Sequence, residues 1–267
     1  MALEPVKRVI VHADDFGLHP ALNEGIERAH QTGIVTSTSL MPLGPAFGDA
    51  VRRSRELPEL DVGLHFTLVG VPGCPPTLSA FLGEYARRRI TSRVIAVSLR
   101  NQLDMVVKCG LSLSHIDSHQ HLHALPGIMR VVCPIAAEYG IRAIRLPLDG
   151  PAHTIIGPGR RVQAAALRVM ARLSRHYITA AGLQTSDHFS GMAVSGHLTA
   201  SILTAYLQDA RPGLTEIVCH PGTDNTALSA SFNWGFDWEG ELSALQAPEV
   251  HQVAQSDSVV LTMWRDL

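Results

Sequence analysis

Short apolar runs alternate with longer amphipathic segments along almost the whole chain, and glycine or proline residues separate them. Residues 7–12 have the composition of a buried strand, and residues 20–31 have the period of a helix that begins at Pro20 and ends before Gly33. The same order predicts further strands near 36–41, 61–66, 115–117, 143–146, 187–191, 216–219 and 259–262, and further helices near 46–56, 92–109, 127–139, 161–181, 198–208 and 249–255. Residues 147–159, rich in glycine and proline, are expected to be irregular. Alternation of this kind favours an α/β fold with a parallel sheet.

Polar residues at strand ends favour one of the two main α/β architectures. Such residues follow five of the predicted strands: Asp14 and Asp15, His65, His119, Arg145 and His220. A closed ring brings the ends of that many strands to one centre, so we expect an irregular (β/α) barrel with about seven parallel strands. A doubly wound open sheet is the alternative. No shift in composition marks a linker, so residues 1–267 are expected to form a single domain.

The composition narrows the class of protein. Hydrophobic residues make up 46% and charged residues 17% of the chain, which suffices for a full core and excludes a disordered protein. Lys and Arg number 22 against 24 for Asp and Glu, so there is no net basic field to hold nucleic acid, and nucleic acid is not an expected partner.

The cysteines and the apolar runs indicate where such a protein works. The four cysteines are far apart and include no C-x-x-C pair, which argues against a zinc finger or a disulfide framework. No signal peptide is apparent, and no apolar stretch approaches the roughly 18 to 20 residues of a membrane helix. We therefore expect a cytoplasmic protein with no membrane span.

Two adjacent carboxylates, Asp14 and Asp15, come at the end of the first predicted strand. They could form an ordinary turn in which Asp15 caps the next helix. In the functional interpretation one of them binds a divalent cation and the other remains free as a general base. The sequence alone does not assign the two roles.

Histidines supply the other candidate ligands. His65 alone could be a core histidine, but a second cluster contains His119, His121 and His123 at alternating positions. We expect that cluster to lie on an extended segment that projects two or three imidazoles toward one region, with His115 and Asp117 orienting them from behind. A histidine tract on the surface is the alternative. Asp and His together are typical ligands of a borderline divalent ion.

Three further residues have a simple structural explanation beside a functional one. His220 ends another apolar strand before a Pro-Gly turn, and it could be a turn residue or the acid that protonates a leaving amine. Arg145 could pair with Asp14 or clamp a substrate. Trp234 lies in an aromatic segment at 232–238 that could pack in the core or stack on a sugar.

Taken in order, these motifs resemble the YdjC-like carbohydrate deacetylases, which include chitooligosaccharide deacetylases. The similar segments are the residues 13–17, 36–38, 63–65, 115–123 and 219–222, and they extend over nearly the whole chain. Residues 187–196 are also similar to a hopanoid-associated branch that acts on a lipid-linked sugar. Residues 71–76 depart from the family, because relatives often carry a longer insertion there.

The resemblance implies an irregular (β/α) barrel, one divalent ion and removal of acetyl from an N-acetylated sugar, either an oligosaccharide or a glycolipid. By position it makes Asp15, His65 and His119 the metal ligands and Asp14 the base. Magnesium is the usual ion of the family, whereas two imidazoles favour zinc. A homodimer is common among such relatives. A phosphoesterase with the same ligands and a non-catalytic sugar-binding relative are the alternatives.

Overall fold

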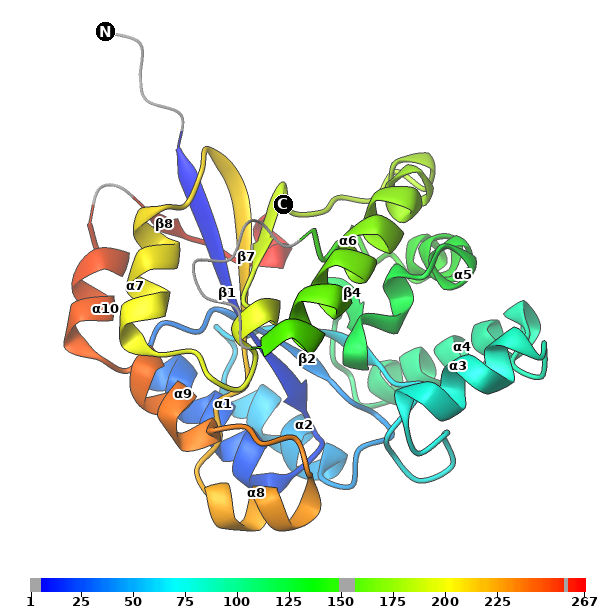
Figure 1. Cartoon of the computed structure of the whole chain (residues 1–267), viewed down its shortest axis with the longest axis horizontal. Coiled ribbons are helices and arrows are strands. Elements are labelled where there is room, and N and C mark those ends of the chain that lie inside the picture. The colour runs from blue at the N-terminus through cyan, green and yellow to red at the C-terminus, as the bar shows by residue number, and fades with distance from the viewer. Residues whose placement is uncertain (1–5, 149–156, 257–258) are drawn as a thin grey trace, which may run out of the picture.

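Seven parallel strands curl into a half-barrel in the computed structural model, which describes residues 6–148, 157–256 and 259–267 (Figure 1). Their order along the sheet is β5 (Ala143–Ile144), β4 (His115–Ser118), β3 (Asp61–Phe66), β2 (Ser37–Leu40), β1 (Lys7–Phe16), β7 (Gly213–Cys219) and β6 (His188–Ser190), and a short β8 (Val260–Leu261) pairs with β1. An isolated parallel bridge between Ala143 and Gln184 joins β5 to the segment that precedes β6. The prediction of an irregular barrel in a single domain is therefore confirmed.

Helices cover the outside of the sheet. Their bounds are α1 (Pro20–Gln31), α2 (Phe47–Glu56), α3 (Leu78–Ala86), α4 (Ser92–Lys108), α5 (Pro126–Glu138), α6 (Gly157–Ala180), α7 (Ala200–Gln208), α8 (Asn225–Ser231), α9 (Trp238–Leu245) and α10 (Pro248–Ala254), with single 3₁₀ turns η1 (His119–Ala124), η2 (Met192–Val194) and η3 (Trp264–Asp266). Neighbouring helices pack in pairs, α4 on α5, α5 on α6, α1 on α9 and α7 on α10 (Figure 1). One large apolar cluster lies between these helices and the strands.

Three helices were not predicted from the sequence. Helix α3 buries only Phe81, so its period is faint, and α8 and α9 are one to two turns long. The irregular stretch predicted over 147–159 lies largely outside the described residues, since 149–156 are not among them. Within the described part of the chain, no helix has both the length and the apolar character needed to cross a membrane.

Close backbone contact fixes the loop after β7. A Cβ atom on Gly25 of α1 would lie 2.5 Å from Cα of Gly222, so only glycine allows this helix to touch the turn that follows His220. Helix α1 begins at Pro20, and the Nδ1 of His19 accepts a hydrogen bond from the backbone N–H of Ala21. The start of α1 and the end of β7 are thereby held at the same end of the barrel.

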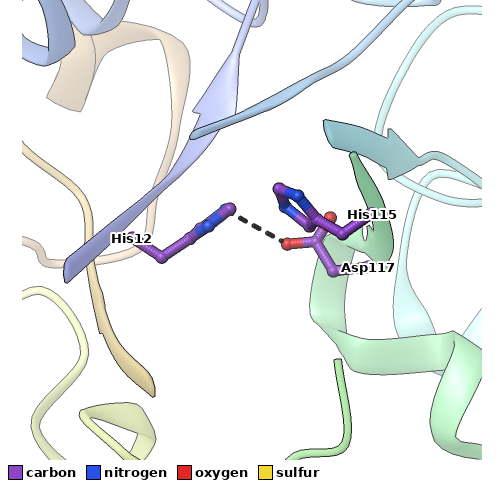
Figure 2. Close-up of side chains that lie close together, drawn as sticks. All are labelled: His12, His115 and Asp117. Atoms are coloured by element: carbon purple, nitrogen blue, oxygen red, sulfur yellow. Dashed lines mark ion pairs between the residues drawn. The ribbon is translucent and has the colours of Figure 1, made fainter. Parts of the chain in front are cut away.

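The inside of the barrel is polar as well as apolar. His12 of β1 faces His115 and Asp117 of β4, with His12 Nε2 3.4 Å from Asp117 Oδ2 (Figure 2). The His115 ring fills the space where Gly63 has no side chain, since a Cβ there would lie 2.4 Å from the ring. All three side chains are fully buried. Strand β3 therefore needs glycine two residues before His65.

Acid should destabilise the fold through His115. Burial and the nearby Arg145 lower the pKa of His115 to about 4, although the surrounding carboxylates act to raise it. Because the unfolded chain then binds more protons than the folded one, stability falls as pH drops from about 6.5 toward 4, by roughly 1–3 kcal/mol for this group. Urea denaturation across this pH range should show a shallower loss for His115→Phe than for the wild type. Equal slopes for both proteins would contradict the assignment.

Candidate functional site

Strand β1 ends in a bulge that turns two consecutive acids toward the same cavity. In a regular strand Asp14 and Asp15 would point to opposite faces. Here the register between β1 and β2 shifts between Ala13 and Phe16, and Asp15 has a left-handed φ of 70°. Aspartate tolerates this backbone conformation better than most residues. Both carboxylates consequently line one cavity, which a strand-end pattern alone does not reveal.

Three candidate metal ligands converge on one point. Asp15 Oδ1 lies 2.9 Å from Nδ1 of His119 and 3.3 Å from Nε2 of His65. One ligand atom from each residue lies within 4.8 Å of the others, and all three side chains are buried. They come from β1, β3 and the start of η1. The expected group of Asp15, His65 and His119 is thus brought together.

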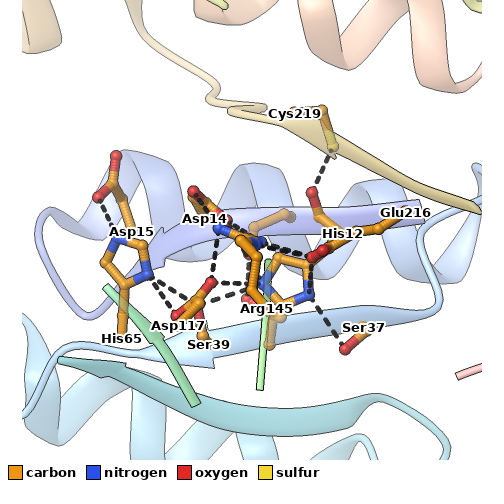
Figure 3. A network of polar contacts seen from close by, with 12 residues as sticks. His12, Asp14, Asp15, Ser37, Ser39, His65, Asp117, Arg145, Glu216 and Cys219 are labelled. Carbon is orange, nitrogen blue, oxygen red and sulfur yellow. Dashed lines mark hydrogen bonds and ion pairs between the residues drawn. The ribbon is translucent and has the colours of Figure 1, made fainter. Parts of the chain in front are cut away.

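Groups behind His65 fix its orientation (Figure 3). Its Nδ1 donates to Oδ1 of Asp117 over 2.8 Å, and Ser39 Oγ lies 2.9 Å from the same nitrogen. The other ring nitrogen, Nε2, is left facing Asp15. A carboxylate behind a histidine in this way is the usual support of a metal-binding imidazole. Asp117 therefore supports His65, whereas it was expected to orient the histidines of the 119–123 cluster.

The charges around these ligands favour a cation. Burial alone would raise the pKa of Asp15, but the neighbouring His119 and His65 hold it well below its usual value. Burial opposes protonation of His65, yet the surrounding carboxylates, Asp117 foremost, raise its pKa to about 10. A proton is therefore strongly held where a metal ion would supply the same positive charge. The residues fit a divalent cation.

Two other groups of His and Asp are close enough to hold an ion, but they are worse candidates. These are His12, His115 and Asp117, and Asp14, His65 and Asp117. Both include Asp117, whose Oδ2 lies 2.7 Å from Nη1 of Arg145. The guanidinium already neutralises this carboxylate, and a second cation beside it would be repelled. The cluster around Asp15 has no such competitor.

Arg145 is an internal ion-pair partner. Its Nη1 and Nη2 donate to Oδ2 and Oδ1 of Asp14 over 2.9 and 2.8 Å, as Figure 3 shows. The side chain is fully buried and does not line the cavity. Of the two roles left open for it, pairing with Asp14 fits and a direct clamp on substrate does not.

His220 follows β7 on the other side of the cavity. Its backbone N–H donates to Oε2 of Glu241, and its Nδ1 lies 3.8 Å from the same oxygen. Burial would lower the pKa of His220, but Glu241 and the more distant carboxylates raise it above its usual value. Ser195 Oγ lies 3.4 Å from Nδ1. The imidazole is thus held in place, and its pKa lies above that of an exposed histidine.

These side chains share a cavity of about 330 Å³. The described residues that line it are Asp14, Asp15, His65, His119, Gln120, His121, Gln163, Met192, Ser195, His220, Trp234 and Phe236. Its walls therefore combine acids and imidazoles with aromatic and amide groups, and no described lining residue is Lys or Arg. The Trp234 ring stacks on Phe232 with centroids 4.7 Å apart and lies 5.6 Å from the His119 ring.

The histidine-rich segment does not have the predicted extended form. The strand stops at Ser118, and Gln120 and His121 take left-handed φ values of 56° and 54° within a 3₁₀ turn. The expected extended form was wrong, but two of the three imidazoles, those of His119 and His121, still line the same cavity. His121 reaches the cavity, while His123 is fully buried and contacts Ser118 Oγ and the carbonyl oxygen of Arg145.

Sequence patterns missed several residues around the site. Glu241, Ser195 and Ser39 lie in segments with no recognisable motif, and only the fold brings them near the histidines. His12 is an exception, because it precedes Asp14 by two positions on the same strand and so faces the same side. That spacing was a usable signal.

Comparison with known proteins places the chain in a family. The sequence pattern of the family described as YdjC-like protein matches residues 8–256. The chain belongs to the YdjC-like family. A protein from Brevibacillus brevis named carbohydrate deacetylase is 32% identical over 97% of this chain and 99% of its own length. A human protein with the same name is 31% identical over 98% of this chain and 92% of its own. These YdjC-like relatives support a hydrolase enzyme.

Solved structures share the same architecture. A crystal structure of a protein from Enterococcus faecalis V583 superimposes with a TM-score of 0.77, covers 98% of each chain and is 23% identical in sequence. An uncharacterised protein from Agrobacterium tumefaciens C58 is more distant, with a TM-score of 0.52 and 12% identity. At these identities the likeness concerns the fold of the YdjC-like chain.

Proposed function

We propose that this YdjC-like protein is a metal-dependent hydrolase that removes the acetyl group from an N-acetylated sugar. One observation carries the proposal: Asp15, His65 and His119 meet at one point of a cavity that Asp14 and His220 also line. Amide hydrolysis needs an activated water, a base to take its proton and an acid for the leaving nitrogen. The names of the relatives point to a carbohydrate as the substrate.

Asp15, His65 and His119 would hold the ion. A bound divalent ion supplies a Lewis acid for the acetyl carbonyl and lowers the pKa of a water molecule. Two imidazoles with one carboxylate suit zinc, and oxygen-rich surroundings suit magnesium, so both ions belong in the test. Three protein ligands leave room for water and substrate.

Asp14 acts as the general base in this proposal. It takes the proton of the attacking water. Asp14 is available for this role because its neighbour Asp15, and not Asp14, faces the histidines of the proposed metal site. Arg145 holds both Asp14 oxygens, which keeps the carboxylate in one orientation while each oxygen retains a further lone pair. Asp14 is thus aimed at the cavity.

His220 acts as the general acid. Burial lowers the pKa of His220, but Glu241 raises it above its usual value, so the imidazole holds a proton more readily than an exposed histidine does. It donates that proton to the sugar nitrogen as the C–N bond breaks, and acetate leaves. His220 and Asp14 come from different strands that both open onto the cavity, which separates the acid from the base.

The cavity walls favour an uncharged acetamide over a phosphate. A phosphoesterase needs cations around the phosphoryl oxygens. Arg145 is fully buried among three carboxylates, and no Lys or Arg is among the described residues that line the cavity. The deacetylase proposal is therefore the better supported of the two.

The test is mass spectrometry of reaction products. Purified protein loaded with Zn²⁺ or Mg²⁺ is incubated with N-acetylglucosamine oligosaccharides and N-acetylated glycolipids, and p-nitrophenyl phosphate serves as a parallel substrate. Loss of one acetyl group with release of acetate is the expected result. Hydrolysis of the phosphate ester alone, or no reaction with any acetylated sugar, would refute the proposal.

Trp234 should contribute to sugar binding. Its half-buried ring lines the cavity next to His119 and offers a flat apolar face to a sugar. Trp234→Ala is expected to raise KM roughly three- to tenfold, the equivalent of about 0.5–1.5 kcal/mol of ring contact. Trp234→Phe should recover part of the loss, and bound metal should stay unchanged in both. A wild-type KM in Trp234→Ala would remove this residue from the binding site.

A further inference from the structure

Glu216 is a buried carboxylate that nothing in the reaction proposed above uses. It lies on β7, is fully buried and does not line the cavity. Burial raises its pKa to about 7 even though Arg145 lies beside it. A third carboxylate next to one guanidinium is costly, because Asp14 and Asp117 already balance that charge. Its presence calls for a role other than neutralising Arg145.

The contacts of Arg145 indicate that role. The three guanidinium nitrogens carry five N–H groups, and five contacts of 2.7–2.9 Å surround them. Oε1 of Glu216 takes two of these contacts, 2.8 Å from Nε and 2.8 Å from Nη2. Asp14 takes two on the adjacent edge, formed by Nη1 and Nη2, and Asp117 takes the fifth. Glu216 is the only one of the three that contacts Nε.

A contact at Nε controls the rotation of the guanidinium plane. With Nε and Nη2 both fixed on Glu216, the edge formed by Nη1 and Nη2 has one direction, and that direction meets Asp14. Without Glu216 the plane is free to turn toward Asp117 alone. Asp14 would then lose its paired contact and its orientation.

We propose that Glu216 is a positioning residue that acts through Arg145 to hold the Asp14 carboxylate in its reactive orientation. This inference rests on the proposed function, since it concerns the base of that reaction. Glu216 itself contacts neither the cavity nor the three metal ligands. Its effect on the rate should therefore appear in kcat and leave substrate and metal binding unchanged.

Two variants of similar volume separate positioning from charge. Glu216→Met fills the space but has no strong acceptor, so kcat should fall about 10- to 100-fold, as expected for a misaligned catalytic group. Glu216→Gln keeps an oxygen that accepts both Arg145 contacts, so it should retain most of the wild-type kcat. KM and the number of bound metal ions should match the wild type in both variants.

A matched control removes another buried carboxylate of the barrel. Asp61 is 2% exposed and accepts hydrogen bonds from Ser37 Oγ and the backbone N–H of Trp264, and no contact with Arg145 involves it. Asp61→Leu should melt at a lower temperature yet keep the wild-type kcat at a temperature where it is folded. An equal loss of kcat in Asp61→Leu and Glu216→Met would show a general loosening of the barrel and overturn the proposal.

A third variant and a crystal structure provide further tests of the role of Glu216. If Glu216→Met does not fold, Glu216→Asp draws the acceptor back from Nε and should give an intermediate kcat. Wild-type kcat in a folded Met or Asp variant, or an equal fall in Glu216→Gln and Glu216→Met, would overturn the inference. A crystal structure of Glu216→Met should show Arg145 without its paired contact to Asp14. Failure of the wild type to release acetate would instead refute the proposed function.

Discussion

Replacing Asp14 with asparagine is expected to lower kcat for deacetylation by about a hundred- to ten-thousandfold. The amide has nearly the shape of the carboxylate but cannot take the proton of the attacking water. Asp15, His65 and His119 are unchanged, so the variant should still bind one divalent ion. Initial rates at saturating substrate, together with elemental analysis of the purified variant, measure both quantities.

The Asp14→Asn substitution also changes the contacts of Arg145, so its effect on stability has to be separated from its effect on the rate. The amide loses one of its two contacts with the guanidinium, which leaves buried N–H groups without a partner and should lower the melting temperature. Rates are therefore compared at a temperature where both proteins are folded. Undiminished deacetylation by folded Asp14→Asn would rule out Asp14 as the base.

Replacing Asp15 with alanine is expected to remove both the bound metal and the activity. Its Oδ1 is the atom on which both histidines converge, and it carries the only negative charge in that group of three. Loss of the ion removes several kcal/mol of stabilisation from the transition state. A fall in kcat/KM of about a thousandfold or more corresponds to about 4 kcal/mol. Calorimetric titration with Zn²⁺ and with Mg²⁺ measures the lost binding.

A histidine variant at a neighbouring cluster serves as the control for Asp15→Ala. His115→Phe alters the group formed with His12 and Asp117, which does not line the cavity. It should still bind one ion with wild-type affinity. An ion that persists in Asp15→Ala and disappears in His115→Phe would move the metal to the inner cluster and contradict the assignment.

The fold could be predicted from the sequence because each unit of it is local. A strand such as β1 contains a short apolar run at residues 9–11, and α1 begins at a proline and ends near a glycine. Parallel strands that alternate with helices leave few arrangements. Helices α3 and α8 were missed because each buries a single apolar side chain, and α9 was missed because eight residues are too few to carry a clear period. The incomplete closure between β5 and β6 depends on the single bridge at Gln184, which no local pattern specifies.

The candidate site was predictable only where its residues sit at the ends of strands. Asp15, His65 and His220 follow apolar runs, and the sheet necessarily brings such positions together. The backbone turns that aim the side chains could not be predicted. The left-handed residues Gln120 and His121 replaced an expected extended segment. The left-handed Asp15 brought two adjacent acids to one side.

The supporting network was beyond sequence analysis for a different reason. Arg145 and Glu216 are 71 positions apart, and Ser39 and Asp117 are 78 apart, so only the curled arrangement of the sheet joins them. Buried charges of this kind are tolerated only when their partners are present. Their positions therefore follow from the tertiary fold and cannot be predicted from the spacing of residues in the sequence.

The proposed reaction requires one divalent ion held by Asp15, His65 and His119. The most direct test of this requirement is to strip the protein with a chelator and to follow acetate release while Zn²⁺ or Mg²⁺ is added back in known amounts. We expect no activity in the stripped protein and a linear recovery that ends at one ion per chain. Full activity in the stripped protein, or recovery that continues equally in Asp15→Ala, would contradict this requirement.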